Sequence, residues 1–139
     1  MDQADIALYD KEHLAVFYDI NTRMVRMKWK GFATSAQLRE GLQQFLDIVI
    51  SEKSLICLAD LKHMQSINQS DEEWIVNKWF PKFVLTGVKK MAFVTSLDYF
   101  NNTSINRIMR STQPLITFET EYFVDSSDAY QWLLDGDKD

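Results

Sequence analysis

The sequence predicts an α/β fold, bordering on α+β, in which an antiparallel opening is followed by alternating strands and helices. The first thirty residues predict three strands, and in the third of these apolar and polar side chains alternate with a period of two, as in a half-buried strand. Residues 54–59 and 90–95 are short segments with apolar centres, typical of strands covered on both faces. Segments with helical spacing separate the later strands. The predicted order is therefore βββαβαβαβα, a mixed sheet with right-handed crossovers.

The composition suits a single compact domain over residues 1–139, with a frayed tail at 136–139. The chain has 139 residues, 46% of them hydrophobic and 13% aromatic, with only four Gly and two Pro. That supply of apolar side chains is ample for a packed core. Fifteen basic residues stand against twenty acidic ones, and the net charge of -5 argues against general adhesion to nucleic acid or anionic membrane.

Three antiparallel strands open the chain. We expect them at Ile6–Tyr9, Leu14–Ile20 and Arg23–Lys30. In the third strand, apolar residues alternate with the basic residues Arg26, Lys28 and Lys30. One face of this meander is therefore expected to be solvated and cationic.

A helix at residues 36–51 comes next. Thr34 and Gln37 have the spacing of a capping box, and apolar residues then recur every three or four positions. The strand Ser54–Ala59 follows, and it contains the only cysteine, Cys57. Because this thiol lies in an apolar run, we expect it to behave as a small buried hydrophobic residue.

Residues 60–69 are polar and irregular, and we expect a loop there. Ser70 and Glu73 form a second capping-box pattern, which predicts the next helix. Pro81 should kink or end that helix because proline removes a backbone donor, and Gly87 should stop it.

The remaining elements repeat the alternation of strands and helices. We expect a strand at 90–95, a helix at 101–111, a strand at 116–123 and a last helix that starts at Asp125. Ala129, Trp132 and Leu133 should face inward from that last helix.

Several short segments resemble the SpoIIAA-like fold, which STAS domains share with Sec14-type lipid-binding domains. They are Trp29–Phe32 before the first helix, Leu58–Leu61 at a buried strand, Gly87–Ala92 entering the next strand, and Ala129–Leu133 near the end. The chain is most similar to small bacterial single-domain proteins labelled STAS/SEC14, and the resemblance covers nearly its whole length.

This resemblance implies the mixed sheet described above and a regulatory or lipid-related role. STAS anti-sigma-factor antagonists carry a phosphorylatable serine in an Asp-Ser-Ser/Thr-Gly segment after the buried strand. Residues 60–70 hold no such segment. Sec14-type relatives enclose a lipid in a much larger domain.

Catalytic signals in the sequence are few. His13 and His63 are the only histidines, and with one cysteine they give no paired ligand spacing, so we expect no metal site and no cofactor. Asp60, His63 and Asp98 follow predicted strands and would do acid–base work if they met in a pocket. The alternative is that they serve turns, helix caps and solvent contacts.

Ligands of open α/β sheets bind beyond the carboxyl ends of the strands, where polar and aromatic residues gather here. The candidates for a ligand or partner surface at this edge are Lys62, His63, Tyr99 and Asn101. A second set comes from the helix before and around Pro81, namely Trp74, Trp79, Phe80 and Lys82. This aromatic stripe suits either a ligand groove or ordinary core packing, and Trp74 lies off the main stripe, where exposure is expected.

Charge is unevenly distributed along the chain. Residues 74–110 hold six basic residues against one acid, whereas residues 112–139 hold seven acids and one base. With Arg26, Lys28 and Lys30, the basic middle predicts a surface for an acidic partner or for a second copy of the chain. The alternative is a purely solubilising surface.

The leading functional hypothesis is a non-enzymatic interaction or regulatory module that forms a homodimer through a strand edge or the cationic face. The alternative is a protein that binds a small apolar or lipid-like ligand at the loops that follow the central strands. A small hydrolase or transferase ranks third. An acidic start and the lack of a long apolar run predict a cytoplasmic protein with no stable membrane insertion and no nucleic-acid partner.

Overall fold

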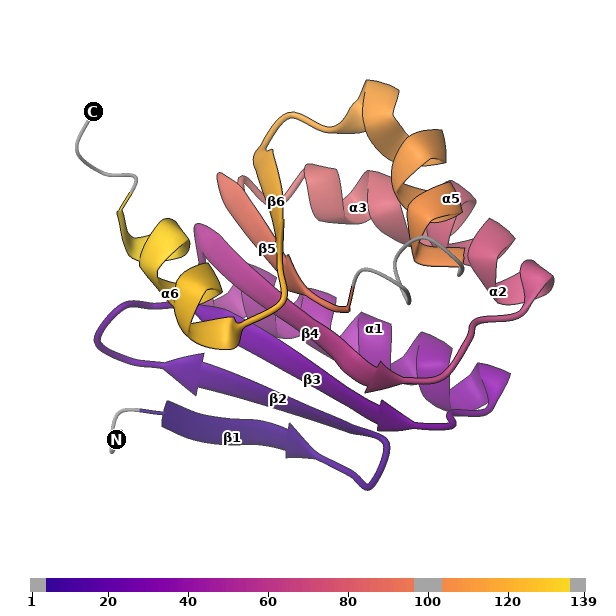
Figure 1. The fold of residues 1–139 in the computed structure, drawn as a ribbon, viewed down its shortest axis with the longest axis horizontal. Coiled ribbons are helices and arrows are strands. Elements are labelled where there is room, and N and C mark those ends of the chain that lie inside the picture. Colours follow the sequence, from indigo (N-terminus) through magenta and orange to yellow (C-terminus); the bar gives the residue numbers. More distant parts are fainter. Residues whose placement is uncertain (1–4, 97–103, 136–139) are drawn as a thin grey trace.

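A computed structural model describes residues 5–96 and 104–135. Six strands form one mixed sheet in the order β1-β2-β3-β4-β5-β6 (Figure 1). The strands are β1 (Asp5–Asp10), β2 (Leu14–Asp19), β3 (Val25–Gly31), β4 (Ile56–Met64), β5 (Lys90–Val94) and β6 (Glu119–Phe123). Pairs β1–β2 and β2–β3 are antiparallel and the other three are parallel. The predicted fold class and element order are confirmed.

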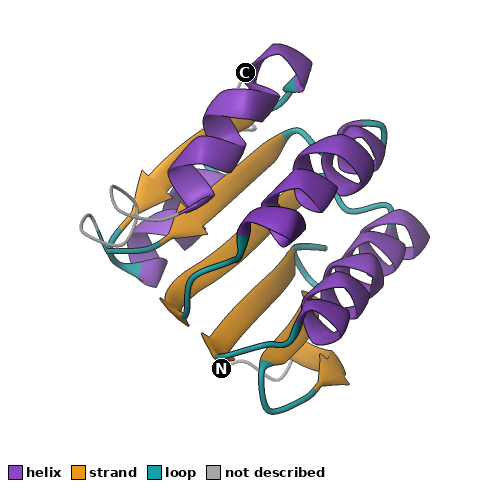
Figure 2. Ribbon diagram, turned by 90° about the vertical axis from the view of Figure 1, so that its right-hand side faces the viewer, coloured by secondary structure: helices purple, strands orange, loops and turns teal. Residues whose placement is uncertain are grey.

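Helices cover the two faces of the sheet unequally. They are α1 (Ser35–Glu52), a continuous helix made of α2 (Gln69–Trp74), the π-helical turn η1 (Ile75–Trp79) and α3 (Phe80–Val84), then α5 (Ser104–Thr112) and α6 (Ser126–Leu134). A short 3₁₀ turn, η2 (Gln113–Leu115), follows α5. The main core joins α1, the α2–α3 helix and α5 to one face (Figure 2), and α6 is the one helix of the described residues that packs on the opposite face.

The first helix begins as expected. The Thr34 hydroxyl accepts from the Gln37 backbone, and the Gln37 side chain accepts from the Thr34 backbone N–H, which completes the predicted capping box. Lys53 ends the helix in a left-handed conformation, with φ of 53°. The local spacing was therefore sufficient to place α1 to within a residue at each end.

The loop prediction for residues 60–69 was wrong, because β4 continues to Met64. Lys28 pairs with Asp60 and Lys30 pairs with His63, so β4 has one more residue than β3 over this stretch. This bulge points both Leu61 and Met64 into the core although they are three residues apart. The period of two is broken there, which hid the strand from the sequence pattern.

The prediction of a second capping box at Ser70 and Glu73 was also wrong, because Asn68 rather than Ser70 caps α2. The Asn68 side chain accepts from the Asp71 N–H at 2.8 Å. Asp71 is buried, and its carboxylate accepts from the Ser35 hydroxyl at 2.8 Å and from Nε of Arg39 at 3.0 Å. These bonds hold the start of α2 against the start of α1, and they select the earlier of two possible caps.

Of the two outcomes expected at Pro81, a kink or an end of the helix, the end does not occur, because the helix runs on to Val84. The start of the last strand is corrected. The last strand starts at Glu119 rather than at residue 116, because η2 occupies the turn before it. Gly87 lies just beyond the α2–α3 helix with φ of 91°, as expected of a stop. The start of the helix predicted at 101–111, Asp98 and the predicted tail at 136–139 lie outside the described residues.

Helix α1 lies close against the sheet at Gly41. A Cβ at this position would lie 2.6 Å from Cδ2 of Leu14 and 2.9 Å from Cη2 of Trp29. We expect Gly41→Ala to lower the free energy of unfolding by about 1–3 kcal/mol, because overpacking outweighs the higher helix propensity of alanine. Urea denaturation followed by circular dichroism measures this. The exposed neighbour is the control: Glu40→Ala should change stability by less than about 0.5 kcal/mol.

The Arg39–Asp71 contact gives a second prediction. The Asp71 side chain is 4% exposed and that of Arg39 is 37% exposed. Arg39→Met leaves a buried carboxylate without its charged partner, and we expect a loss of about 2 kcal/mol, below the value for a fully buried pair. In the control, Arg107→Met, the lost partner of Glu72 is a solvent-exposed guanidinium, so the loss should be much smaller. If both variants lost the same free energy of unfolding in the urea experiment, the burial of Asp71 would add nothing to the strength of its ion pair with Arg39.

Candidate functional site

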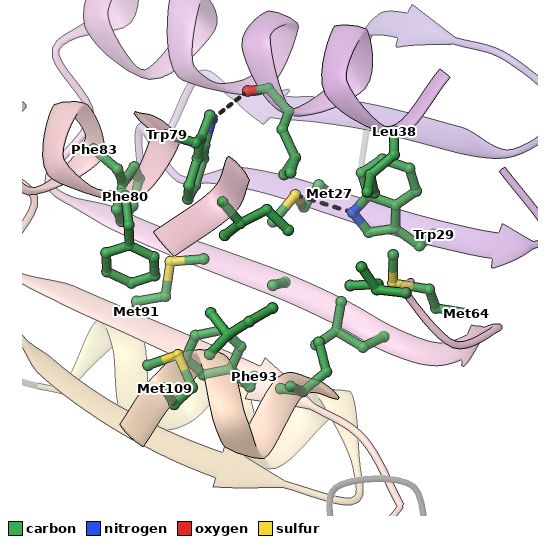
Figure 3. A pocket seen from close by; sticks show the side chains of 17 residues that line it. Met27, Trp29, Leu38, Met64, Trp79, Phe80, Phe83, Met91, Phe93 and Met109 are labelled. Carbon is green, nitrogen blue, oxygen red and sulfur yellow. Dashed lines mark hydrogen bonds between the residues drawn. The ribbon is translucent and has the colours of Figure 1, made fainter. Parts of the chain in front are cut away.

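A cavity of about 60 Å³ lies between the sheet and its main helical layer (Figure 3). The side chains around it come from β3, β4, β5, α1, the α2–α3 helix, α5 and the loop before α2, and all are aliphatic, aromatic or thioether groups. They are Met27, Trp29, Leu38, Leu42, Ala59, Leu61, Met64, Ile67, Ile75, Trp79, Phe80, Phe83, Met91, Phe93, Ile105, Ile108 and Met109. The lining therefore offers an apolar ligand dispersion contacts and no ionisable group.

Four methionines surround the cavity, each from a different element. Met27 comes from β3, Met64 from β4, Met91 from β5 and Met109 from α5. An unbranched thioether side chain has several rotatable bonds and adapts to irregular space. The walls of this cavity can therefore change shape at lower cost than walls of branched side chains.

The π-helical turn η1 shapes one wall of the cavity. The N–H of Phe80 donates to the carbonyl of Ile75, five residues back. Proline in an α-helix clashes with the carbonyl four residues before it, and the wider turn just before Pro81 relieves that clash without ending the helix. The turn directs Ile75 and Trp79 toward the sheet, and Nε1 of Trp79 donates to the Leu42 carbonyl at 2.8 Å (Figure 3).

The aromatic stripe predicted on this helix faces the core and the cavity together. Trp79 and Phe80 are 4% and 5% exposed, and Trp79 stacks on Phe83 with ring centroids 5.0 Å apart. The core-packing alternative is confirmed, and the same side chains also line the cavity. The expectation of an exposed Trp74 was wrong: it is half-buried, with the Arg39 guanidinium 5.2 Å from its ring centre.

A polar notch adjoins the cavity at the carboxyl ends of β3 and β4. It has a volume of about 410 Å³ and shares Leu38, Met64 and Ile67 with the cavity. Ser35 and Asp71 form part of its polar wall. Sequence reasoning placed a site at this edge of the sheet but missed both residues, since only the folded chain brings them together across 36 positions.

The two weak catalytic candidates that the structure describes, Asp60 and His63, do not line this notch. Asp60 and His63 lie within β4, where Oδ1 of Asp60 accepts from the Lys62 N–H at 3.1 Å and His63 is exposed opposite Lys30. Neither lines the cavity or the notch. Asp98, Tyr99 and Asn101, the other candidates from this edge, lie outside the described residues.

The cationic face of β3 is less free than expected. Arg26 forms an ion pair with Asp5, and its guanidinium lies 4.2 Å from the ring centre of Phe17. Lys28 is half-buried, whereas Lys30 and the neighbouring Lys62 are exposed. The prediction of a fully solvated basic strand was therefore wrong at Arg26. Lys82, from the aromatic helix, is exposed and lies in a different hollow, beside Leu85.

Nucleophiles and metal ligands are sparse in the part of the chain that the structure describes. Residues 5–96 and 104–135 contain no group of three or more His, Cys, Asp or Glu side chains that would hold a metal ion. Cys57 is fully buried, and burial raises the pKa of its thiol far above the ordinary value. Such a thiol is held in its unreactive neutral form. None of the helices in the described ranges combines the length and apolar character of a membrane span.

Comparison with known proteins identifies the fold family. A solved structure from Shewanella loihica PV-4, an uncharacterised protein of the DUF3478 family with a SpoIIAA-like fold, is similar, with a TM-score of 0.57 at 17% sequence identity. The similarity covers 90% of this chain and 97% of that one. No curated protein matches. The family model described as SpoIIAA-like matches residues 24–134, from the residue before β3 to the end of α6, so this chain belongs to the SpoIIAA-like family.

Proposed function

We propose that this protein is a non-enzymatic binding module that holds a small apolar molecule in the cavity between the sheet and its main helical layer. The observation that carries the proposal is the apolar lining, to which six elements of the fold and the loop residue Ile67 contribute. Acid–base or nucleophilic catalysis needs an ionisable or nucleophilic group at the reacting atoms, and this lining presents neither.

The cost of an unfilled cavity supports the proposal. Protein interiors are close-packed, and unfilled space costs roughly 24 cal/mol per Å³, so about 60 Å³ costs about 1.5 kcal/mol. A larger side chain at Ala59, which borders the cavity from a central strand, would remove much of this cost. Because Ala59 is small and the methionines around the cavity are adaptable, we infer that the space accommodates a ligand.

The dimensions restrict the ligand to a compact molecule. An apolar cavity of about 150 Å³ holds benzene. The cavity here is smaller, so benzene would enter only after the methionine side chains rearrange. The notch beyond Leu38, Met64 and Ile67 gives the natural route of entry, because the two hollows share these residues.

Methionine methyl groups provide a direct test of ligand binding. We expect xenon or benzene to shift the methyl NMR signals of Met27, Met64, Met91 and Met109 in protein labelled with [methyl-¹³C]methionine. Met24 is the internal control, because it is buried in the separate cluster under α6 and should not shift. Absence of shifts at saturating probe, or an equal shift at Met24, would rule out the cavity as the binding site.

A pair of alanines gives matched variants for the same test. Ala59 and Ala92 are both fully buried on central strands, but Ala59 borders the cavity whereas Ala92 faces α6. Ala59→Val should fill the cavity and abolish the probe-induced shifts, and Ala92→Val should leave them intact. Retained binding in Ala59→Val would place the probe elsewhere.

Self-association is a second proposal, and it is supported by the open edge of β1. Within residues 5–96 and 104–135 this strand pairs only with β2, and its aliphatic side chains Ile6 and Leu8 are 42% and 43% exposed. Backbone groups on an unpaired edge favour pairing with another strand, although the bulge between Ala7 and Tyr9 shortens the regular part of this edge. The partner we propose is a second copy of the chain.

Light scattering after size exclusion tests the homodimer and locates it. We expect the wild type to elute as a dimer and Leu8→Arg to elute as a monomer, because a charge on the edge disfavours pairing of the two strands. Lys28→Glu combined with Lys30→Glu tests the alternative interface, the basic face of β3. A monomeric wild type at high concentration would contradict both interfaces, and a monomer from the lysine variant alone would move the interface to β3.

A further inference from the structure

The end of the molecule where β4 and β5 begin carries a surface of mixed basic and aliphatic character. Two hollows of about 700 and about 340 Å³ lie there, and both include Lys53 and Leu55, so they form one continuous surface. In Figure 1 this is the left-hand side, opposite the cavity's entrance notch. We call it the amino-end surface and define it by Ile50, Lys53, Leu55, Lys82, Leu85 and Lys89.

Three aliphatic side chains protrude from the amino-end surface. Ile50 in the last turn of α1 is 54% exposed, Leu55 before β4 is 48% exposed, and Leu85 after α3 is 84% exposed. A single exposed leucine is ordinary, but three from separate segments around one surface indicate a contact that removes them from water.

The three lysines of this surface are free to bind an anion. Lys53, Lys82 and Lys89 are exposed, and none of their ammonium groups forms an ion pair with a residue in the described ranges. Two further basic residues nearby are engaged: Arg23 donates to the Glu52 carbonyl, and the Lys90 amino group lies 4.3 Å from the ring centre of Trp132. Among the described residues, the acids nearby include Glu119, which lines the larger hollow, and Glu52, which directly precedes Lys53 at the end of α1.

We propose that the amino-end surface docks on an anionic lipid bilayer, with the aliphatic side chains entering the interface and the lysines contacting lipid phosphates. Lysine stems cover apolar area while their ammonium groups stay at the headgroups, which suits a surface where basic and aliphatic residues alternate. The six defining residues include no aromatic ring, so stacking on nucleic-acid bases has no platform here. The acid excess of the remaining chain would be repelled by the same bilayer, so it favours docking in this one orientation.

Vesicle flotation measures this docking. We expect the protein to float with vesicles containing one third phosphatidylglycerol and to remain free with vesicles of phosphatidylcholine alone, and added salt should weaken the binding. Lys53→Glu combined with Lys89→Glu should weaken binding by about tenfold or more. Leu85→Ser, which leaves the charge unchanged, should also reduce binding, because it removes an aliphatic contact.

The control must change the net charge equally at the other end of the strands. Lys30→Glu combined with Lys62→Glu does so at two exposed residues near the carboxyl ends of β3 and β4, and it should retain binding. If both double variants lost vesicle binding equally, binding would depend on the net charge of the protein rather than on the amino-end surface, and the proposal would be overturned. Equal binding to neutral vesicles, no vesicle binding by the wild type, or binding to polyuridylate in place of vesicles with the same sensitivity to Lys53 and Lys89 would also overturn it.

Discussion

The burial of β4 on both faces is the constraint on which the rest of the structure depends. Cys57, Leu58 and Ala59 are completely buried, and alternate side chains of a strand point in opposite directions. Both faces of the sheet must therefore be covered at this strand. One face receives α1, the α2–α3 helix and α5, whereas α6 alone covers Leu58 and its neighbours on the other. The chain meets this constraint with parallel crossovers that return helices to one face and with a final helix that closes the other.

The thick helical layer on the first face creates the cavity. The small Ala59 lies on β4 between Met27 on β3 and Phe93 on β5, and it leaves space under the helices at this point of the sheet. The helix over this space contains a proline and still continues, because its π-helical turn avoids the clash with an earlier carbonyl. The π-helical turn that accommodates Pro81 thus also determines which side chains of this helix border the cavity.

Charged groups are arranged by the same sheet. At the carboxyl ends of β3 and β4, Asp71 is buried and joined to Ser35 and Arg39, so charge there stabilises the contact between two helices. At the amino ends of β4 and β5, Lys53 and Lys89 have no such partners in the described ranges and remain in solvent.

The sequence by itself determined the element order, the buried strands, the capped start of α1 and the resemblance to the SpoIIAA-like family. These features are encoded within a few neighbouring residues, as in the Thr34–Gln37 box, where both partners lie in one turn. Tertiary contacts decided the rest. Asn68 rather than Ser70 caps α2, because Asp71 reaches α1. Strand β4 extends to Met64, because a bulge keeps it paired with β3. Arg26 is not fully exposed, because it forms an ion pair with Asp5. The cavity has no local signal at all, because its walls come from residues 27–109, and their distances are fixed only when sheet and helices pack together.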